Sequence, residues 1–283
     1  MREEDLASEA WLAEIELRPD RWRDEHTRSA VVVESGKRVA AGIMWTSPIH
    51  ADRYWIEIIV DPTRRRNGIG TAMFDHLANL RPDDLPFKTR GYVDEVRMAF
   101  ADSLGARTIQ VVPPALIDVA DRLVLRPHQA VGSARSVSWA ELLQANASIY
   151  EWTHQTWSPV SPGFAATLNQ GLEDYLDLDA SSVALDRSGR ITAVAMAYRD
   201  AVRPIVTAES VARDGPDGER MVEACIRATL DAFAERGIVE VQFDGHVSDP
   251  HFLPVWSRLQ PNGRWFRLVE MPATYDHHGR QVS

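Results

Sequence analysis

Three consecutive arginines and two glycines stand close together in the stretch R-R-R-N-G-I-G at residues 64–70. A guanidinium group binds phosphate oxygens through two parallel hydrogen bonds. Gly68 and Gly70 carry no Cβ atom, so a ligand can approach their backbone closely. These residue types at this spacing indicate a binding site for a phosphate or diphosphate group.

The flanking sequence predicts the elements that hold this stretch. Residues 54–60, Y-W-I-E-I-I-V, form a short apolar run rich in β-branched and aromatic residues, which predicts a buried strand. Residues 61–67 contain a proline and the arginines, which predicts a loop. The next apolar residues fall at helical spacing: Ile69, Ala72, Met73, Leu77 and Leu80. Because the first N–H groups of a helix lack internal partners and lie at its positive end, strand, turn and helix together form an anion cradle.

Two common nucleotide-binding patterns do not fit this stretch. The Walker pattern requires a lysine after its last glycine, whereas Thr71 follows Gly70. The dinucleotide pattern G-x-G-x-x-G/A fits at Gly68 and Gly70 but meets Met73 at its third position.

The spacing instead resembles the acyl-CoA-binding signature of the GNAT superfamily of N-acetyltransferases, V-x-P-x-x-[RQ]-x-x-G-x-[GA]. The matching residues are Val60, Pro62, Arg65, Gly68 and Gly70. Since the preceding strand and the following helix agree as well, the resemblance is more specific than a lone G-x-G. The alternative is an ordinary basic turn with a glycine-rich helix start.

The resemblance implies that acetyl-CoA is the co-substrate and that its diphosphate binds at the turn. It also implies that the strand before the turn splays from its neighbour, so that its backbone pairs with the pantetheine arm and the Val60 N–H polarises the thioester region. The residues assigned to the coenzyme in this way are Ile59, Val60, Arg65, Arg66, Asn67, Gly68, Ile69, Gly70 and Thr71.

Acyl transfer to an amine also requires a base. In the family this is often a Glu on the same strand, and Glu57 is the one acidic residue in the run 54–60. A carboxylate in an apolar strand suits this role. The alternative is that Glu57 faces solvent or pairs with Arg53 or Arg90.

A general acid is less evident. The resemblance implies a Tyr on the helix after the one that follows the phosphate turn, four residues before the glycine that ends it. Gly105 marks that glycine here. Ala101 occupies that position, so the usual Tyr is absent. Tyr92 is a weak substitute at the start of the same helix.

The remaining pattern predicts two similar α/β domains, each a mixed α+β sheet of the GNAT type. Residues 1–132 follow the order helix, two strands, strand, helix, strand, helix, strand, and carry the intact turn. A small polar stretch at residues 127–136 predicts the boundary. Residues 133–283 repeat a similar order, including a last strand at 265–269. We therefore expect a catalytic domain at 1–132 and a scaffold domain at 133–283 that shapes the acceptor side.

The second domain departs from the signature at its own turn. In the stretch A-R-D-G-P-D-G-E-R at residues 212–220, Asp214, Asp217 and Glu219 stand where the family signature implies arginine. Negative side chains repel a diphosphate in a low-dielectric site. The second domain is therefore expected to be a degenerate repeat that does not hold CoA. The alternative is an unrelated α/β domain.

Two further groups of residues bear on the acceptor. Trp45 and Trp55 lie on strands near the proposed site, where they either line the acceptor pocket or simply pack. The stretch D-G-H-V-S-D-P-H at 244–251 contains two His and two Asp. Helix capping is the first interpretation of it, acceptor contact through Asp244 and His246 the second, and a metal site the last, so no metal is expected.

Composition limits the function classes. The net charge of -10 does not suit a nucleic-acid partner. No apolar run approaches the ~18 residues of a membrane span, and the N-terminus does not resemble a signal peptide. Cys225 is the single cysteine, which leaves no pair for a disulfide. We expect a cytoplasmic protein, monomeric because the repeat acts as an internal pseudo-dimer.

The sequence as a whole predicts an acetyl-CoA-dependent N-acetyltransferase that acetylates a primary amine of a small molecule. A cationic antibiotic, which would imply antibiotic resistance, or another basic metabolite fits the acidic second half. A protein N-acetyltransferase and a non-catalytic CoA-binding sensor or scaffold are the alternatives.

Overall fold

The computed structural model describes residues 10–200, 202–215 and 217–272. The chain divides into two compact units, one formed by residues 1–109 and 268–283 and the other by residues 110–267. Each unit is built on a six-stranded sheet that mixes antiparallel and parallel neighbours. The expected α/β fold class with two domains is confirmed.

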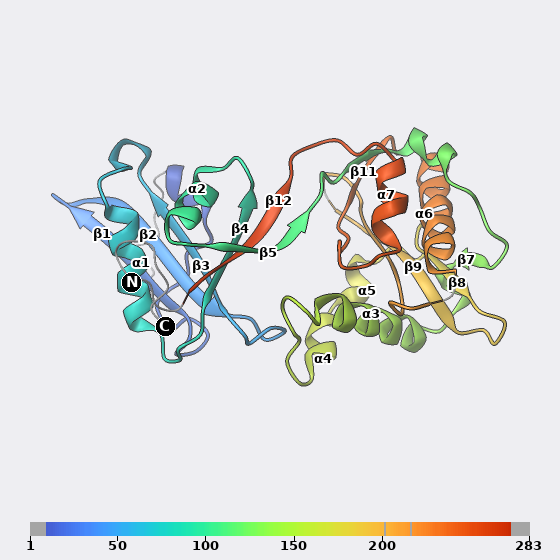
Figure 1. Cartoon of the computed structure of the whole chain (residues 1–283), viewed down its shortest axis with the longest axis horizontal. Coiled ribbons are helices and arrows are strands. Elements are labelled where there is room, and N and C mark those ends of the chain that lie inside the picture. Colours follow the sequence, from blue (N-terminus) through green and yellow to red (C-terminus); the bar gives the residue numbers. More distant parts are fainter. Residues whose placement is uncertain (1–9, 201, 216, 273–283) are drawn as a thin grey trace. The chain divides into compact units, whose positions relative to one another are not determined.

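The sheet of the first unit has the strand order β1-β2-β3-β4-β12-β5. Its strands are β1 (Arg28–Glu34), β2 (Lys37–Thr46), β3 (Tyr54–Val60), β4 (Phe87–Tyr92), β5 (Arg107–Val112) and β12 (Phe266–Met271). The hairpin of β1 and β2 turns at Ser35 and Gly36, both of which have positive φ. Figure 1 shows β12, from the far end of the chain, lying beside β4 and β5.

Helices cover one face of this sheet. These are α1 (Ile69–Leu80) and α2 (Val96–Ser103). The short 3₁₀ helix η2 (Ala10–Glu14) packs on the opposite face, where Leu12 joins Ala41 and Ile59, and the 3₁₀ helix η3 (Pro62–Arg64) follows β3. Tyr54 and Ile56 of β3 point to the same side and join a core with Phe74 and Leu77 of α1 and Met98 of α2. Because side chains alternate along a strand, this side of β3 contributes to the core that also contains both helices.

Strands β3 and β4 run parallel but stay paired for only a short distance. Their register contains Tyr54↔Phe87 and Trp55↔Lys88. On the other side, β3 pairs with β2 along its whole length, from Tyr54 to Val60. Beyond Trp55, therefore, β3 diverges from β4 while remaining anchored to β2, which opens the sheet toward the turn that follows Val60.

The second unit is built on the other six-stranded sheet. Its sheet runs β6-β11-β10-β9-β8-β7. The strands are β6 (Leu116–Asp118), β7 (Val131–Ser133), β8 (Ser182–Leu185), β9 (Ile191–Tyr198), β10 (Ile205–Ser210) and β11 (Glu240–Phe243). The helices are α3 (Trp139–His154), α4 (Phe164–Leu168), α5 (Leu172–Tyr175), α6 (Gly218–Glu235) and α7 (Phe252–Arg258), with 3₁₀ turns η4 (Val119–Val124) and η5 (Ala134–Ser136).

The boundary between the two units does not fall at a single place in the sequence. The expected boundary after residue 132 lies inside the second unit, because β6 pairs with β11 and β7 pairs with β8. The stretch 127–136 is thus part of a sheet rather than a linker. The last strand, expected in the second domain, belongs to the first sheet. An alternating pattern predicts a strand, but it does not say which sheet provides the partner.

Part of the first expected helix, residues 3–17, lies outside the described residues, and residues 10–14 form a 3₁₀ turn. Within the described part of the chain, no helix is long and apolar enough to cross a membrane.

Candidate functional site

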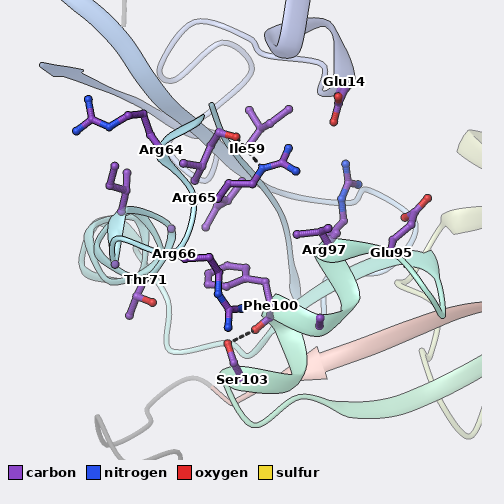
Figure 2. A pocket seen from close by; sticks show the side chains of 17 residues that line it. Glu14, Ile59, Arg64, Arg65, Arg66, Thr71, Glu95, Arg97, Phe100 and Ser103 are labelled. Carbon is purple, nitrogen blue, oxygen red and sulfur yellow. Dashed lines mark hydrogen bonds between the residues drawn. The ribbon is translucent and has the colours of Figure 1, made fainter. Parts of the chain in front are cut away.

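A cavity of about 970 Å³ lies in the first unit where β3 meets the starts of α1 and α2 (Figure 2). Its lining comes from η2, the end of β3, the turn after it, α1 and α2. The lining residues are Glu14, Ile58, Ile59, Val60, Arg64, Arg65, Arg66, Gly68, Ile69, Gly70, Thr71, Glu95, Val96, Arg97, Ala99, Phe100 and Ser103. Of the residues assigned to the coenzyme from sequence, Asn67 alone is outside this set.

The turn after β3 is shaped so that backbone faces the cavity. Asp61 accepts the N–H of Thr63 at 2.8 Å and begins η3. Arg66 and Gly68 both adopt positive φ, +66° and +78°, and α1 starts directly after Gly68. A Cβ added to Gly68 would meet nothing within 4 Å, so the first N–H groups of α1 are open to a ligand.

The three arginines of the turn make different contacts. Arg65 Nε donates to the carbonyl oxygen of Val60 at 3.1 Å, which fixes its side chain over the end of β3. Arg64 pairs with Glu34 on β1. Arg66 extends toward Ser103 of α2 across the cavity (Figure 2). Together they give this end of the cavity the positive charge that a diphosphate requires.

The diverging part of β3 presents backbone groups to the opening. The Tyr54 N–H points toward β4, since it donates to the carbonyl of Pro86 at 3.0 Å. Backbone groups alternate along a strand, so the N–H groups of Ile58 and Val60 point the same way, beyond the end of the β3–β4 ladder. The Ile59 N–H points toward β2 instead. Of the two backbones expected to pair with a pantetheine arm, that of Val60 is therefore directed correctly, and that of Ile58 joins it.

Glu57 lies on β3 beside the cavity. Its Oε1 is 3.6 Å from Nη1 of Arg97, which projects from the first turn of α2 and lines the cavity. The partner is neither Arg53 nor Arg90: Arg53 pairs with Asp52 and Glu270. Glu57 itself is not among the lining residues, whereas its partner Arg97 is.

Neither Tyr92, the candidate for the general acid, nor Ala101, at the position of the absent Tyr, lines the cavity. Tyr92 ends β4, is 39% exposed and is not a lining residue. Ala101, at the position where the family carries Tyr, is 1% exposed and packs in the core of the unit.

The tryptophans expected on the acceptor side stack on each other. The rings of Trp45 and Trp55 lie 6.2 Å apart on neighbouring strands. Lys88 and Arg90 of β4 approach the Trp55 ring, with the Lys88 Nζ at 4.8 Å and the Arg90 Cζ at 5.4 Å from its centroid. This group is a cation–π cluster, and its members are not lining residues of the cavity.

Sequence reasoning missed the contribution of α2. Its cavity face consists of Val96, Ala99, Phe100 and Ser103, with Arg97 at the edge. Spacings of three and four residues place these side chains on one side of a helix. The pattern is visible in the sequence, but only the packing of α2 against α1 shows that this side meets a cavity: the Phe100 ring lies 3.4 Å from where a Cβ on Gly70 would be.

The corresponding corner of the second unit is filled by its own side chains. Strands β10 and β11 pair at Ile205↔Gln242 and Val206↔Phe243 and then diverge, as β3 and β4 do. Across the opening, Glu209 on β10 accepts the N–H of His246 at 2.9 Å and its Nδ1 at 2.6 Å. Burial opposes the charge on His246, but the Glu209 carboxylate outweighs it and raises the pKa of His246.

A second bridge lies one residue further along β10. The buried carboxylate of Asp249 accepts the Ser210 N–H at 2.9 Å and the His251 N–H at 2.7 Å. Asp249 therefore fixes the backbone just before α7, whereas α7 itself has no side-chain cap, so the helix capping expected from the sequence is not observed here. The His251 ring covers the start of α6: a Cβ on Gly218 would lie 2.3 Å from its Nδ1. In the first unit the residue just before α1, Gly68, has open surroundings.

Asp244 and His246, the other residues expected on the acceptor side, lie in this second unit, where His246 packs edge-on to His154 at 4.5 Å between ring centroids. Among the residues that the structure describes, no group of three or more His, Cys, Asp or Glu side chains is placed to hold a metal ion.

Comparison with known proteins agrees with this geometry. Residues 2–83 match the family described as "Acetyltransferase (GNAT) family". No curated protein sequence matches the chain. A GCN5-related N-acetyltransferase from Sphaerobacter thermophilus is similar in structure, with a TM-score of 0.60 and 14% identity over 87% of this chain and 80% of that one.

Two further structures share the fold. A tandem GNAT protein from the clavulanic acid biosynthesis pathway has a TM-score of 0.55 and 15% identity over 88% of this chain and 84% of that one. A GCN5-related glucosamine N-acetyltransferase region of a fungal β-N-acetylglucosaminidase has a TM-score of 0.58 and 14% identity over 88% of this chain and 33% of that one. Residues 2–83 of this chain thus match the GNAT acetyltransferase family, and the chain shares the fold of GNAT proteins along most of its length and divides into two units.

Proposed function

We propose that the first unit transfers an acetyl group from acetyl-CoA to a primary amine of a small molecule, and that the acceptor is a cationic antibiotic or another basic metabolite. The observation that supports this most is the cavity, which joins an open helix start and three arginines at one end to the diverging edge of β3 at the other. A diphosphate and an extended amide-containing arm are the two chemical groups that such a cavity fits.

The donor would be held by two sets of backbone groups. The N–H groups at Ile69 and Gly70 lie at the positive end of α1 and would bind the diphosphate, with Arg65 and Arg66 beside it. The outward N–H of Val60 would pair with the pantetheine arm and place the thioester near Glu57. Holding the thioester next to the amine removes much of the entropic barrier to their reaction.

In the reaction itself the amine nitrogen attacks the thioester carbonyl carbon. The new N–C bond forms, the C–S bond breaks, and the amine proton passes to the Glu57 carboxylate and then to solvent. The sulfur leaves as thiolate and takes up a proton. Glu57 is proposed as the base because it is the acidic residue on β3 and its partner Arg97 lines the cavity.

We further propose that the chain has one donor site. In the second unit the Glu209–His246 and Asp249–Ser210 bridges take up the backbone groups and the space that a pantetheine arm would need. The His251 ring at Gly218 takes the place of a diphosphate. The second domain would then act as a scaffold.

Calorimetric titration with acetyl-CoA tests the donor site, and the expected stoichiometry is one. Gly68→Val should weaken binding at least tenfold, about 1.4 kcal/mol, because its side chain enters the open helix start. Gly36→Val is the matched control: Gly36 has the same φ of +78° and equally open surroundings, but lies in the β1–β2 hairpin. Both variants bear the same backbone strain, so equal affinities of the two variants for acetyl-CoA would show that acetyl-CoA does not bind at the turn containing Gly68.

A panel of amines with acetyl-CoA, followed by release of the CoA thiol, tests the acceptor. Release with small basic amines supports the proposal, and release with peptides alone would favour a protein N-acetyltransferase. The second candidate function is a CoA-binding sensor, which the absence of Tyr at position 101 favours. Tight binding without thiol release for any amine or peptide would establish that function instead.

A further inference from the structure

Arg97 is the cation nearest to the proposed base. It projects from the first turn of α2, lines the cavity, and reaches Glu57 on β3 with 3.6 Å between Nη1 and Oε1. Because β3 and β4 have already diverged at this level, the ion pair spans the opening in which the thioester arm would lie. Figure 2 shows Glu14 and Glu95 as the other charged side chains around this end of the cavity, with Arg65 toward its middle.

Arg97 also stands one helical turn before Ala101, the position at which the sequence signature leads us to expect a tyrosine acid. Residues four apart lie on nearly the same helix face, and side chains lean toward the N-terminal turn. The space that a tyrosine at 101 would cover is therefore the space next to Arg97. Ala101 is 1% exposed in the core and offers no hydroxyl, whereas the guanidinium-bearing Arg97 one turn earlier lines the cavity.

We propose that Arg97 stabilises the thiolate that leaves in the acetyl transfer, in place of a proton-donating tyrosine. This inference rests on the proposed function of the first unit. A guanidinium group stays protonated at all working pH values and does not supply the proton. It stabilises charge instead, so the C–S bond breaks to give an anionic sulfur, which is later protonated by water.

The ion pair with Glu57 gives this arrangement a consistent charge balance. Before the reaction, Arg97 lies beside the Glu57 carboxylate. When the amine proton moves to Glu57, that carboxylate becomes neutral, and a negative charge develops on the sulfur as the C–S bond breaks. One negative charge thus remains near the guanidinium group throughout, and the group is already oriented before the reaction begins.

Hydroxylamine is the probe that isolates this step. Its nitrogen is unprotonated at neutral pH, so its attack on acetyl-CoA needs no base, and its small size needs no acceptor pocket. We expect the protein to accelerate CoA release with hydroxylamine. Arg97→Gln should lower kcat by on the order of 10²-fold, as removal of one oriented charge-stabilising donor does elsewhere, whereas Arg97→Lys, which keeps the charge, should lose less.

Two control variants separate catalysis from binding and from the base. Arg64→Gln removes another cavity arginine, one that pairs with Glu34 at the phosphate end, and should raise KM for acetyl-CoA with little change in kcat. Glu57→Gln should reduce turnover with an alkyl amine far more than turnover with hydroxylamine. Addition of ethylguanidinium should restore part of the activity of Arg97→Ala, which a purely structural role for Arg97 would not allow.

Three results would overturn the role of Arg97: no acceleration with hydroxylamine by a protein that releases CoA with an amine, an unchanged kcat in Arg97→Gln, or a loss confined to the Kd for CoA. Failure of the proposed function has a different signature, since the native protein would then show no calorimetric binding of acetyl-CoA or would release no CoA thiol with any amine.

Discussion

Lys88 is a buried amine whose protonation should make the stability of the protein depend on pH. It lies on β4 opposite Trp55 and is 2% exposed, with its Nζ 3.8 Å from Oδ1 of Asp52. Burial lowers the pKa of Lys88 from 10.5 to about 8, against the opposing effect of Asp52. In a chain whose other lysine is the exposed Lys37, this is the one buried ammonium group among the residues described.

The sign of the effect follows from proton binding. Below pH 8 the folded and unfolded chains both hold the proton of Lys88. Between pH 8 and 10.5 the folded chain has released it and the unfolded chain still holds it, so the free energy of unfolding rises with pH in this interval. At 1.36 kcal/mol per pH unit, the contribution of Lys88 between pH 7.5 and 10 is about 2 kcal/mol.

Urea unfolding of the native protein and of Lys88→Met, followed by far-UV circular dichroism at both pH values, measures this contribution. The difference in unfolding free energy between the two proteins should move by about 2 kcal/mol in favour of the native protein on going from pH 7.5 to 10. Lys37→Met, in the exposed hairpin, should show no such change. If the Lys88→Met difference is as flat as that of Lys37→Met, the burial argument is wrong.

Three other perturbations follow from local geometry. Glu209→Gln removes the carboxylate that pairs with the buried His246 and should lower the free energy of unfolding by about 3 kcal/mol. Because the folded-state pKa of His246 is raised, the ion pair stabilises the protein below the unfolded pKa, and this stability is lost as pH rises through the folded pKa. The cost measured by urea unfolding should therefore be larger at pH 6 than at pH 9, and equal costs would argue against the ion pair. Gly42→Ala should cost about 1–3 kcal/mol, since the new Cβ would lie 2.9 Å from the Met73 Cγ; an unchanged melting temperature would mean that α1 can shift away from β2. Ser138→Ala removes the capping box of α3 and should cost about 1 kcal/mol in urea unfolding, and no loss would mean that the cap is redundant.

Much of the donor site could be predicted from local sequence. The apolar run before Asp61, the proline and the two glycines each dictate the conformation of their own few residues, and the structure places β3, a tight turn and α1 in that order. A left-handed Gly68 directly before a helix is a local property of the chain. For this reason the strand, the turn and the helix start were expected at nearly the observed residues.

The partners across space could not be predicted in the same way. Arg97 is separated from Glu57 by a helix, a strand and a loop, and many other arginines were available as partners. The Glu209–His246 bridge could not be predicted for the same reason. The acidic turn at 212–220 suggested that the second unit does not bind a diphosphate, but it did not indicate that side chains from beyond β11 fill the opening between β10 and β11.

The amino-acid sequence thus determined the secondary structure around the basic turn at residues 64–70, the presence of two α/β domains and the acidic character of the turn at 212–220, because each depends on residues that are neighbours in the chain. The tertiary structure alone decided where β12 inserts, which cation faces the proposed base, and how the second corner is closed. These depend on strand pairing and side-chain contacts between distant segments, whose energies are set by geometry that a local pattern does not contain.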